Sequence, residues 1–209
     1  MKPFTFYTVA MSRGQIARWA LHEAGADYEQ VVFDWNSRPA ALAQLNPMNK
    51  VPTLVHHIGG QDHVVTECAA ICHYLAEALP GAGLLPRDDE KADYFRWLFF
   101  AAGPLEQAVM AQSLGWQVPE GKASTAGFGS LALTVGVLGQ WLAGHDYVCG
   151  PRFTMADVYL CSQFIWGLRF GTIEDRPAFR AYVDRCTARP RYREGLAIDL
   201  ALIKAAARA

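Results

Sequence analysis

All segments with the character of β-strands lie in the first third of this chain of 209 residues. Runs rich in β-branched and aromatic residues, at 4–9, 28–33, 51–55 and 63–65, predict four strands. Helical spacing of apolar residues predicts three helices among them, at 15–24, 37–45 and 67–79. Two strands joined through a helix are expected to be parallel with a right-handed connection. The pattern therefore predicts a small α/β domain.

Proline and glycine interrupt this alternation at residues 80–86, and such a cluster is typical of a linker. After it the periodicity is helical throughout, with helices expected at 88–112, 130–142, 154–170, 177–188 and 192–207. We therefore expect an α/β domain over residues 1–79, a linker over 80–87 and an all-helical domain over 88–209.

The composition narrows the class of protein. Hydrophobic residues make up 52% of the chain, charged residues make up 19%, and the formal net charge is -1. These values are typical of a globular protein and favour neither nucleic acid nor a membrane as a partner. No stretch of about 18 apolar residues predicts a membrane span, and the N-terminus lacks the features of a secretory signal. Five cysteines at scattered positions favour free thiols in a reducing cytoplasm.

A proline opens the third predicted strand, within Asn46-Pro47-Met48-Asn49-Lys50-Val51-Pro52-Thr53-Leu54. Proline is unusual there because it cannot donate to a strand ladder. If the Val51–Pro52 bond is cis, Val51 turns outward and can offer its N–H and C=O to an extended peptide. A trans proline in an ordinary turn is the more common alternative.

A second motif, Thr66-Glu67-Cys68-Ala69-Ala70-Ile71, opens the helix that follows the fourth predicted strand. The N-terminus of a helix favours an anion, so the N–H of Cys68 could bind a carboxylate while Glu67 binds an ammonium group. Together they would hold the head group of an α-amino acid. Glu67 could equally serve only to complement the helix dipole.

These segments, with Ser12 before the first helix, resemble the glutathione-binding domain of cytosolic glutathione S-transferases. In the helical half, Gly150-Pro151-Arg152-Phe153-Thr154-Met155-Ala156-Asp157-Val158 resembles the buried N-capping box of that family, and Ala188-Arg189-Pro190 resembles its last helix boundary. Thr154 would cap the helix, Asp157 would reach back, and Phe153 and Val158 would form a hydrophobic staple. The resemblance implies a thioredoxin-like domain with a four-stranded mixed sheet and three helices, followed by an all-α domain. The bacterial branches are the most similar.

The resemblance implies glutathione as the co-substrate and no metal. Val51 would pair backbone to backbone with the cysteinyl part of glutathione, beside a cis Pro52. Glu67 and Cys68 would hold the γ-glutamyl end, although family members usually carry serine in place of Cys68, and a thiol is a weaker donor. Lys50 or Asn49 would reach the glycyl carboxylate.

Ser12 is the residue expected to activate the thiol. A free thiol with a pKa of about 8.5 is mostly protonated at neutral pH, and both a hydroxyl donor and a helix N-terminus favour the thiolate. Ser12 could also be only a helix cap. Tyr7 is the rival, but tyrosine-type members place tyrosine four residues before an Arg-Gly pair, which here is Val9. Neither Ser12 nor Arg13 is the cysteine of cysteine-type members, so the serine type fits best.

Aromatic side chains of the helical half could line an apolar pocket for the second substrate. At helical spacing such residues are more often plain core, and we expect this of most of them. The candidates are Trp97, Phe100, Trp116, Trp166 and Phe170.

Two further groups of residues have simple explanations. Cys68 and Cys72 lie four apart on one helix face, where buried free thiols are favoured over a redox pair. Neighbouring histidines on a strand point to opposite faces, so no metal site is expected at His56, His57 and His63.

The resemblance implies a glutathione transferase that presents the thiolate of glutathione to a small hydrophobic electrophile, as in detoxification. A glutathione-dependent disulfide reductase, an isomerase and a non-catalytic binding protein on the same fold are the alternatives. We expect a cytoplasmic homodimer, since two-fold dimers are the commonest soluble assemblies.

Overall fold

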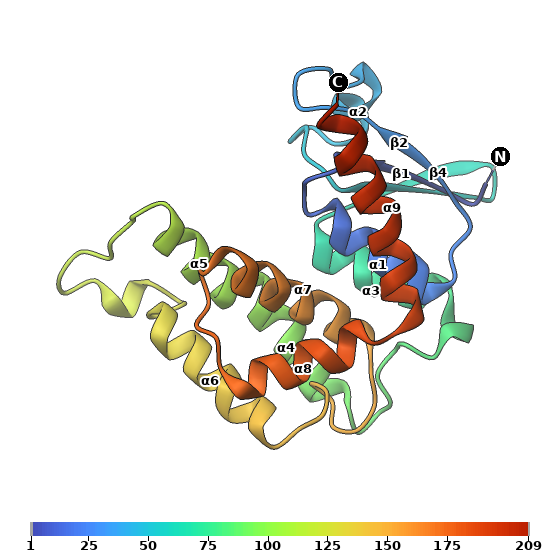
Figure 1. Cartoon of the computed structure of the whole chain (residues 1–209). Coiled ribbons are helices and arrows are strands. Elements are labelled where there is room, and N and C mark those ends of the chain that lie inside the picture. Colours follow the sequence, from blue (N-terminus) through green and yellow to red (C-terminus); the bar gives the residue numbers. More distant parts are fainter. Residues whose placement is uncertain (1, 209) are drawn as a thin grey trace. The chain divides into compact units, whose positions relative to one another are not determined.

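The computed structural model describes residues 2–208, except for the side chain at position 123 (Figure 1). By their internal contacts the described residues divide into two units. Unit 1 comprises residues 2–85 and 188–208, and unit 2 comprises residues 86–187. The boundary between 85 and 86 falls within the predicted linker, but the end of the chain groups with unit 1 rather than with the other helices.

Unit 1 is built on a four-stranded mixed sheet in the order β2-β1-β3-β4. The parallel strands β1 (Phe4–Thr8) and β2 (Tyr28–Val32) are joined through α1 (Gly14–Ala24), as the sequence predicts. The strand β3 (Thr53–Ile58) runs antiparallel to β1, and β4 (Gln61–Thr66) runs antiparallel to β3. β4 is longer than the predicted strand at 63–65 because it pairs with β3 over its full length.

The other helices of unit 1 differ from the predicted ones mainly at their starts. α2 (Ala40–Leu45) is shorter than the predicted 37–45, because Pro39 disfavours helical backbone at the residue before it. α3 (Cys68–Ala78) is followed by a single 3₁₀ turn, η1 (Pro80–Ala82), in the predicted linker. α1 ends at Gly25, whose φ of 68° is the left-handed conformation that glycine adopts readily.

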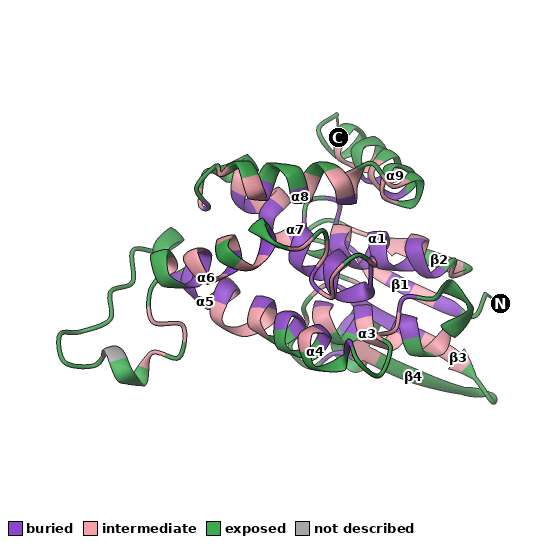
Figure 2. Ribbon diagram, turned by 90° about the horizontal axis from the view of Figure 1, so that it is seen from below, coloured by how far each residue is buried: buried purple, intermediate pink, exposed green. Residues whose placement is uncertain are grey.

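Burial follows this architecture. Buried residues, purple in Figure 2, concentrate on α1 and α3 of unit 1, and in unit 2 on the helix α7 (Met155–Phe170). The described side chains of residues 114–130, by contrast, are all exposed or intermediate. We call residues 114–130 the α5–α6 segment, after the helices that it joins.

Unit 2 is helical, and a π-helical segment divides its first helical stretch. The predicted single helix at 88–112 is wrong in this respect, because Pro104 lacks the N–H that a regular α-helix needs. No helix among residues 2–208 is long and apolar enough to cross a membrane. The elements of unit 2 besides α7 are α4 (Lys91–Phe100), η2 (Ala101–Leu105), α5 (Glu106–Ser113), η3 (Ala123–Thr125), α6 (Leu131–Ala143) and α8 (Pro177–Thr187).

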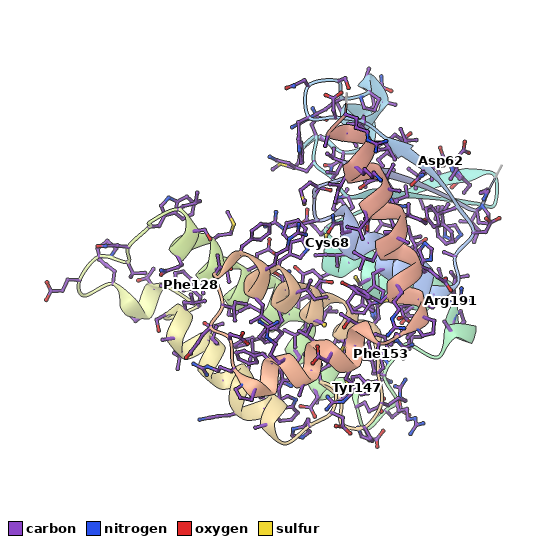
Figure 3. The ribbon with its side chains drawn as sticks, viewed as in Figure 1. Asp62, Cys68, Phe128, Tyr147, Phe153 and Arg191 are labelled. Carbon is purple, nitrogen blue, oxygen red and sulfur yellow. The ribbon has the colours of Figure 1, made fainter. Side chains whose placement is uncertain are left out.

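The capping box predicted at the start of α7 is confirmed. The backbone N–H and the hydroxyl of Thr154 donate to Asp157 Oδ2 at 2.8 and 3.0 Å. Val148 N–H and the Tyr182 hydroxyl donate to Asp157 Oδ1, each at 2.9 Å. Burial raises the pKa of Asp157 to about 6, and these hydrogen bonds oppose the rise. Phe153, at the staple position, is buried and packs edge-on against Tyr147 with ring centroids 5.5 Å apart (Figure 3).

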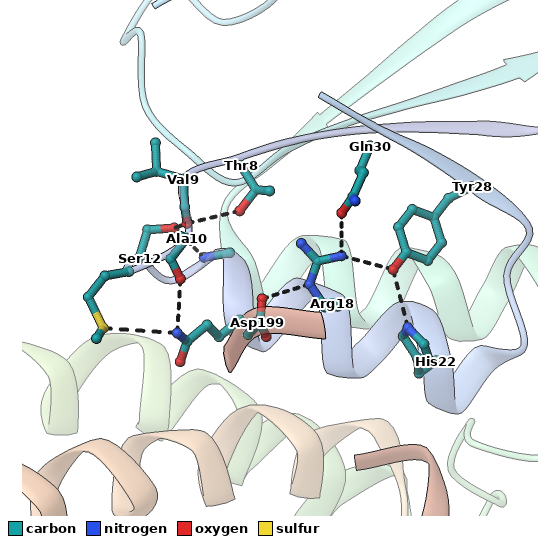
Figure 4. Close-up of polar contacts among 12 residues, drawn as sticks. Thr8, Val9, Ala10, Ser12, Arg18, His22, Tyr28, Gln30 and Asp199 are labelled. Carbon is teal, nitrogen blue, oxygen red and sulfur yellow. Dashed lines mark hydrogen bonds and ion pairs between the residues drawn. The ribbon is translucent and has the colours of Figure 1, made fainter. Parts of the chain in front are cut away.

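The last helix, α9 (Pro190–Ala206), packs against α1 of unit 1. The fully buried Arg18 of α1 donates from Nε to Asp199 of α9 at 2.7 Å (Figure 4). Its Nη1 donates to the Tyr28 hydroxyl at 3.0 Å and to Gln30 Oε1 at 2.8 Å, both on β2. A buried cation is stable only when it is paired and hydrogen-bonded. The pair therefore explains why the end of the chain, assigned by the sequence to the helical domain, belongs to unit 1.

Candidate functional site

The strand register brings the predicted glutathione-binding segments to one edge of the sheet. Tyr7 of β1 is paired with Thr53 of β3, and Thr53 is paired with Thr66 of β4. β1 ends just after Tyr7, β3 begins at Thr53, and β4 ends at Thr66. Residues 9–13, 49–52 and 67–68 therefore flank this edge together, and we call them the strand-end site.

Val51 and Pro52 lie at the centre of this edge. The peptide bond between them is cis, so the prediction is confirmed. Pro52 is buried and Val51 is half-buried. Within the described part of the chain, neither the N–H nor the C=O of Val51 makes a hydrogen bond. Both groups can therefore bind the backbone of an extended peptide.

A buried hydrogen-bond network fixes the turn before Val51. Asn46 Nδ2 donates to Lys50 O and to Thr53 Oγ1, both at 3.2 Å, and Thr53 Oγ1 donates to Lys50 O at 3.0 Å. Asn46 Oδ1 accepts from the N–H of Met48 at 3.1 Å. Asn46 and Thr53 had no predicted role, although both belong to the motif around Val51. Their role is to hold Val51 in place.

Glu67 and Cys68 connect β4 to α3. Glu67 has a φ of 64° and a ψ of 123°, a conformation that is unfavourable for a residue with a Cβ and is concentrated at functional sites. Its side chain is exposed, as the binding of an ammonium group requires. Cys68, labelled in Figure 3, is buried at the start of α3, and its Sγ donates to Arg13 O at 3.5 Å. The start of α3 therefore lies against the start of α1.

Ser12 is buried in the turn between β1 and α1 (Figure 4). Its hydroxyl donates to Val9 O at 2.7 Å and accepts from the N–H of Gly14 at 3.0 Å. Arg13 stands directly before α1 with helical dihedral angles, and the bond from the N–H of Gly14 to the Ser12 hydroxyl is the kind that a helix-capping serine accepts. The alternative interpretation of Ser12 as a cap therefore agrees with the structure. Tyr7, the rival residue, is half-buried at the end of β1.

Cationic side chains lie close to Asn49, where the glycyl carboxylate is expected. Lys50 is exposed. Asn49 has a φ of 51°, and its Oδ1 is buried without a hydrogen-bond partner in the described chain. Arg38 donates from Nη1 to Asn49 O at 2.9 Å and lies over the ring of Trp35 at 5.5 Å. Arg38 had no predicted role, because its contact with Asn49 joins two loops that no local sequence pattern connects.

The five aromatic candidates for the second pocket all lie in unit 2, but no single cluster contains them. Trp97 is fully buried, 5.4 Å from the ring of Phe100, and belongs to the core, as expected for most of these residues. Trp166 and Phe170 form a pair on α7 with ring centroids 5.6 Å apart. Trp116 is 67% exposed and lines a separate cavity against α5.

The thiols of Cys68 and Cys72 are buried and form no disulfide within the described residues, as expected. Burial in an apolar environment raises the pKa of the Cys72 thiol well above its usual range, which leaves it unreactive. The described residues contain no group of three or more histidine, cysteine or acidic side chains arranged to hold a metal ion.

The mixed sheet, the open backbone at Val51 and the helical unit 2 together define a glutathione S-transferase-like fold. Residues 10–78 match the family of glutathione S-transferase N-terminal domains, and residues 109–190 match the family of C-terminal domains. The chain is 30% identical over 173 residues to glutathione S-transferase 2 of Schizosaccharomyces pombe, covering 76% of this chain and 73% of that protein. The chain therefore belongs to the glutathione S-transferase family.

Two further comparisons show the range of this family. Maleylacetoacetate isomerase of Rattus norvegicus is 33% identical over 181 residues, covering 81% of this chain and 80% of that protein. The structure of a sphingomonad glutathione S-transferase complexed with glutathione matches with a TM-score of 0.73 and 27% identity, covering 93% of this chain and 98% of that chain. Transferases and an isomerase are thus both among the relatives.

Proposed function

We propose that this protein is a glutathione transferase that activates the thiol of glutathione for attack on a small apolar electrophile. The observation that carries the proposal is the strand register, which gathers Ser12, Val51 and Glu67 at one edge of the sheet. The sphingomonad relative, whose structure contains glutathione, supports the choice of ligand.

Each part of glutathione has a complementary group at the strand-end site. The cysteinyl backbone pairs with the N–H and C=O of Val51, which make no bond within the described chain. The γ-glutamyl ammonium binds the exposed Glu67, and its carboxylate binds the N–H of Cys68 at the start of α3. The glycyl carboxylate is bound by Lys50 and Asn49 and is attracted by Arg38, which is held against Asn49.

Ser12 stabilises the thiolate. Its hydroxyl accepts a hydrogen bond from the N–H of Gly14, and this polarises the O–H as a donor. Without substrate the hydrogen is directed at Val9 O, and it turns to the sulfur when glutathione binds. A depression of the thiol pKa by about two units corresponds to roughly 2.7 kcal/mol of stabilisation of the thiolate.

The variants Ser12→Ala and Tyr7→Phe test this assignment. We expect Ser12→Ala to raise the pKa of bound glutathione by about one to two units and to lower turnover, because the thiolate loses its donor. Affinity for glutathione should stay nearly unchanged, since Val51 and Glu67 hold the peptide. The thiolate absorbance of the complex, titrated with pH, measures the effect. If Tyr7→Phe shifts the curve and Ser12→Ala does not, the assignment of Ser12 is wrong.

A glutathione-dependent isomerase is the second candidate, favoured by the similarity to the rat isomerase over 81% of this chain. The two activities differ in stoichiometry, because a transferase consumes glutathione and an isomerase regenerates it. Assays with an activated aryl chloride and with a cis-configured unsaturated diketone, each following free thiol, distinguish them. Tight glutathione binding without turnover of either compound, or of a disulfide, would support a non-catalytic protein instead.

We also infer a homodimer. α4 carries exposed aromatic side chains, Phe95 at 39% and Phe99 at 65% exposure, and large apolar side chains of this kind are often covered in an assembly. Sedimentation at micromolar concentration should give twice the chain mass of 23.1 kDa. A single species with the mass of one chain would contradict the inference.

A further inference from the structure

We propose that Thr5, His57 and Asp62 form a second reactive centre, at which the hydroxyl of Thr5 accepts the acyl group of an activated, uncharged ester or thioester. The three residues come from β1, β3 and β4 of unit 1. They lie at the opposite ends of these strands from the strand-end site. The centre is therefore separate from the residues proposed to bind glutathione.

The side chain of His57 bridges the other two residues. Its Nδ1 lies 2.6 Å from Asp62 Oδ1, and its Nε2 lies 2.8 Å from Thr5 Oγ1. Because an ionised carboxylate can only accept, the hydrogen of the neutral imidazole is on Nδ1 and is donated to Asp62. Nε2 then carries a lone pair, and the Thr5 hydroxyl donates to it. Hydroxyl, imidazole and carboxylate in this order activate the nucleophile of serine hydrolases.

The strand register explains why these residues meet. Thr5 of β1 is paired with Val55 of β3, and His57 of β3 is paired with Asp62 of β4. Val55 and His57 are two residues apart on their strand, so all four side chains belong to the same face of the sheet. Neighbours on one face are within reach of a side chain as long as histidine. The sheet rather than a loop therefore sets the geometry of this centre.

This face of the sheet is the more accessible one. Residues 4, 6 and 8 of β1 are buried, whereas Thr5 is half-buried. The side chain of His57 is 19% exposed, and that of Asp62, labelled in Figure 3, is 61% exposed. Val64, which is paired with Val55 on the same face, is 39% exposed and offers apolar surface to a short acyl chain. A small acyl donor can therefore reach the hydroxyl of Thr5.

The position of Thr5 within the sheet requires a donor that is already activated. β1 is paired with β2 on one side and with β3 on the other, so the backbone N–H of Thr5 is directed into a strand ladder. It is not available to stabilise the oxyanion that forms in acyl transfer. General-base catalysis alone contributes about 10²–10⁴ in rate. An ester or thioester with a good leaving group can react under these conditions, whereas an amide cannot.

The charges around Thr5 favour an uncharged donor. Glu29 of β2 is exposed and is paired with Thr5, and Asp62 lies on the other side. Lys2 is neutralised by Asp27, with its Nζ 2.9 Å from Asp27 Oδ1. The carboxylates of Glu29 and Asp62 would therefore repel an anionic acyl donor.

The reaction is an acyl transfer without a change of oxidation state. Thr5 Oγ1 attacks the carbonyl carbon of the donor and forms an ester bond, and the bond from that carbon to the leaving oxygen or sulfur breaks. The proton of Thr5 passes to His57 Nε2 and from there to the leaving group. The alkyl ester on Thr5 is a weaker electrophile than the donor, so we expect it to accumulate as a covalent modification.

The test is acetylation by 4-nitrophenyl acetate in the absence of glutathione, followed by peptide mass spectrometry. We expect an acetyl group on Thr5 of the parent protein, and Thr5→Ser should keep the reaction because it retains the hydroxyl. His57→Gln removes the base and should slow acetylation of Thr5 about a hundredfold. Asp62→Asn removes the charge that orients the imidazole and should slow it at least tenfold.

His63→Gln is the matched control. His63 is exposed on β4 directly after Asp62, but successive side chains of a strand point to opposite faces. Acetylation of Thr5 should therefore be unchanged in this variant. Asp62→Asn changes an exposed side chain, so its effect can be measured even if His57→Gln does not fold. Circular dichroism of each variant verifies the fold.

Two results would overturn the proposal. Acetyl groups on lysines or on His57 but not on Thr5 would show that the hydroxyl of Thr5 is not activated. Equal rates of Thr5 acetylation in the parent, in Asp62→Asn and in His57→Gln would show that the two hydrogen bonds serve only the structure. Failure of the parent protein to bind glutathione bears only on the proposed function.

Discussion

The strand-end site of unit 1 and the cavity of unit 2 differ in the chemical groups that form them. The first is made mainly of backbone groups, such as the N–H and C=O of Val51, at the ends of strands in fixed register. The second is made of side chains on a helix and on the connection that follows it. A site of backbone groups is inherited with the fold, whereas a lining of side chains can change residue by residue. The ligand of the first can therefore be inferred from relatives, and that of the second must come from its own chemistry.

The largest effect should come from Gly14→Ala. This substitution tests whether the strand-end site depends on the close packing of α1 against β1. A Cβ at Gly14 would lie 1.9 Å from Thr8 Oγ1, so the start of α1 must move away from β1 and carry Ser12 with it. We expect a loss of about 2–3 kcal/mol in the free energy of unfolding and a marked loss of glutathione affinity. Urea denaturation and calorimetric titration measure the two.

Gly136→Ala is the matched control in unit 2. A Cβ at this position in α6 would meet nothing within 4 Å, and alanine is the better helix former. The free energy of unfolding should rise by about 0.5–1 kcal/mol, with glutathione affinity unchanged. Equal effects of the two substitutions would remove the contrast between the two sites.

The same contrast explains what the sequence could predict. Local signals were sufficient for the strands, for the glycine that ends α1 and for the capping box of Thr154 and Asp157. These features depend on residues a few positions apart. The cis bond at Val51 was expected from the family resemblance, because a trans proline is the more common case for an isolated motif. The sequence also placed Glu67 and Cys68 at the start of α3, where the register brings them beside Val51.

Features that depend on distant side chains could not be predicted. The contact of Arg38 with Asn49 joins two loops, and the pair of Arg18 with Asp199 spans almost the whole chain. The division of the predicted helix 88–112 depends on how Pro104 is accommodated, for which a kink, a break and a π turn are all possible. The apolar residues of the α5–α6 segment follow neither helical nor strand spacing, so the cavity beside it could not be predicted from the sequence.

An intermediate effect is expected for Thr53→Val, which keeps the shape of the side chain but removes its hydroxyl. Lys50 O loses a donor and Asn46 Nδ2 loses an acceptor, so the turn before Val51 loosens. The free energy of unfolding should fall by about 1–2 kcal/mol, and glutathione affinity should fall with it.

Thr5→Val is the control on the same sheet. It removes the hydrogen bond of 2.8 Å between Thr5 Oγ1 and His57 Nε2, which lies at the opposite ends of β1 and β3 from the strand-end site. The free energy of unfolding should fall by as much as in Thr53→Val or by less, while the affinity for glutathione stays the same. If Thr5→Val weakens glutathione as much as Thr53→Val does, the network at Lys50 has no special role.

The smallest effect concerns the side-chain contacts that hold α9 to α1 within unit 1. His22 of α1 is within 3.2 Å of the Tyr28 hydroxyl and 3.5 Å of Glu194 of α9. Burial lowers the pKa of His22, with a smaller contribution from the charges of Arg18 and Arg191, and the hydrogen bond to Glu194 opposes this. The folded protein thus favours the neutral imidazole.

The sign of the pH dependence follows from this shift. Between the lowered pKa of the folded protein and the ordinary value of about 6.5, the unfolded chain binds more protons at His22. The contribution of His22 to stability is therefore complete above about pH 6.5 and is lost as the pH falls through the folded pKa. Asp157, whose pKa burial raises to about 6, acts in the opposite direction, since its contribution is lost as the pH rises. A pH scan of the parent protein alone would mix the two.

The variant His22→Gln separates them, because Asp157 contributes equally to parent and variant and cancels in the difference. Glutamine can still hydrogen-bond to Tyr28 but does not titrate. The free energy of unfolding of the parent minus that of the variant should be larger at pH 7.5 than at pH 5, by less than about 1 kcal/mol. Urea denaturation at the two pH values measures it. A difference that is larger at pH 5 would mean that protonated His22 is stabilised by Glu194, so that the ion pair rather than burial governs this contact between α1 and α9.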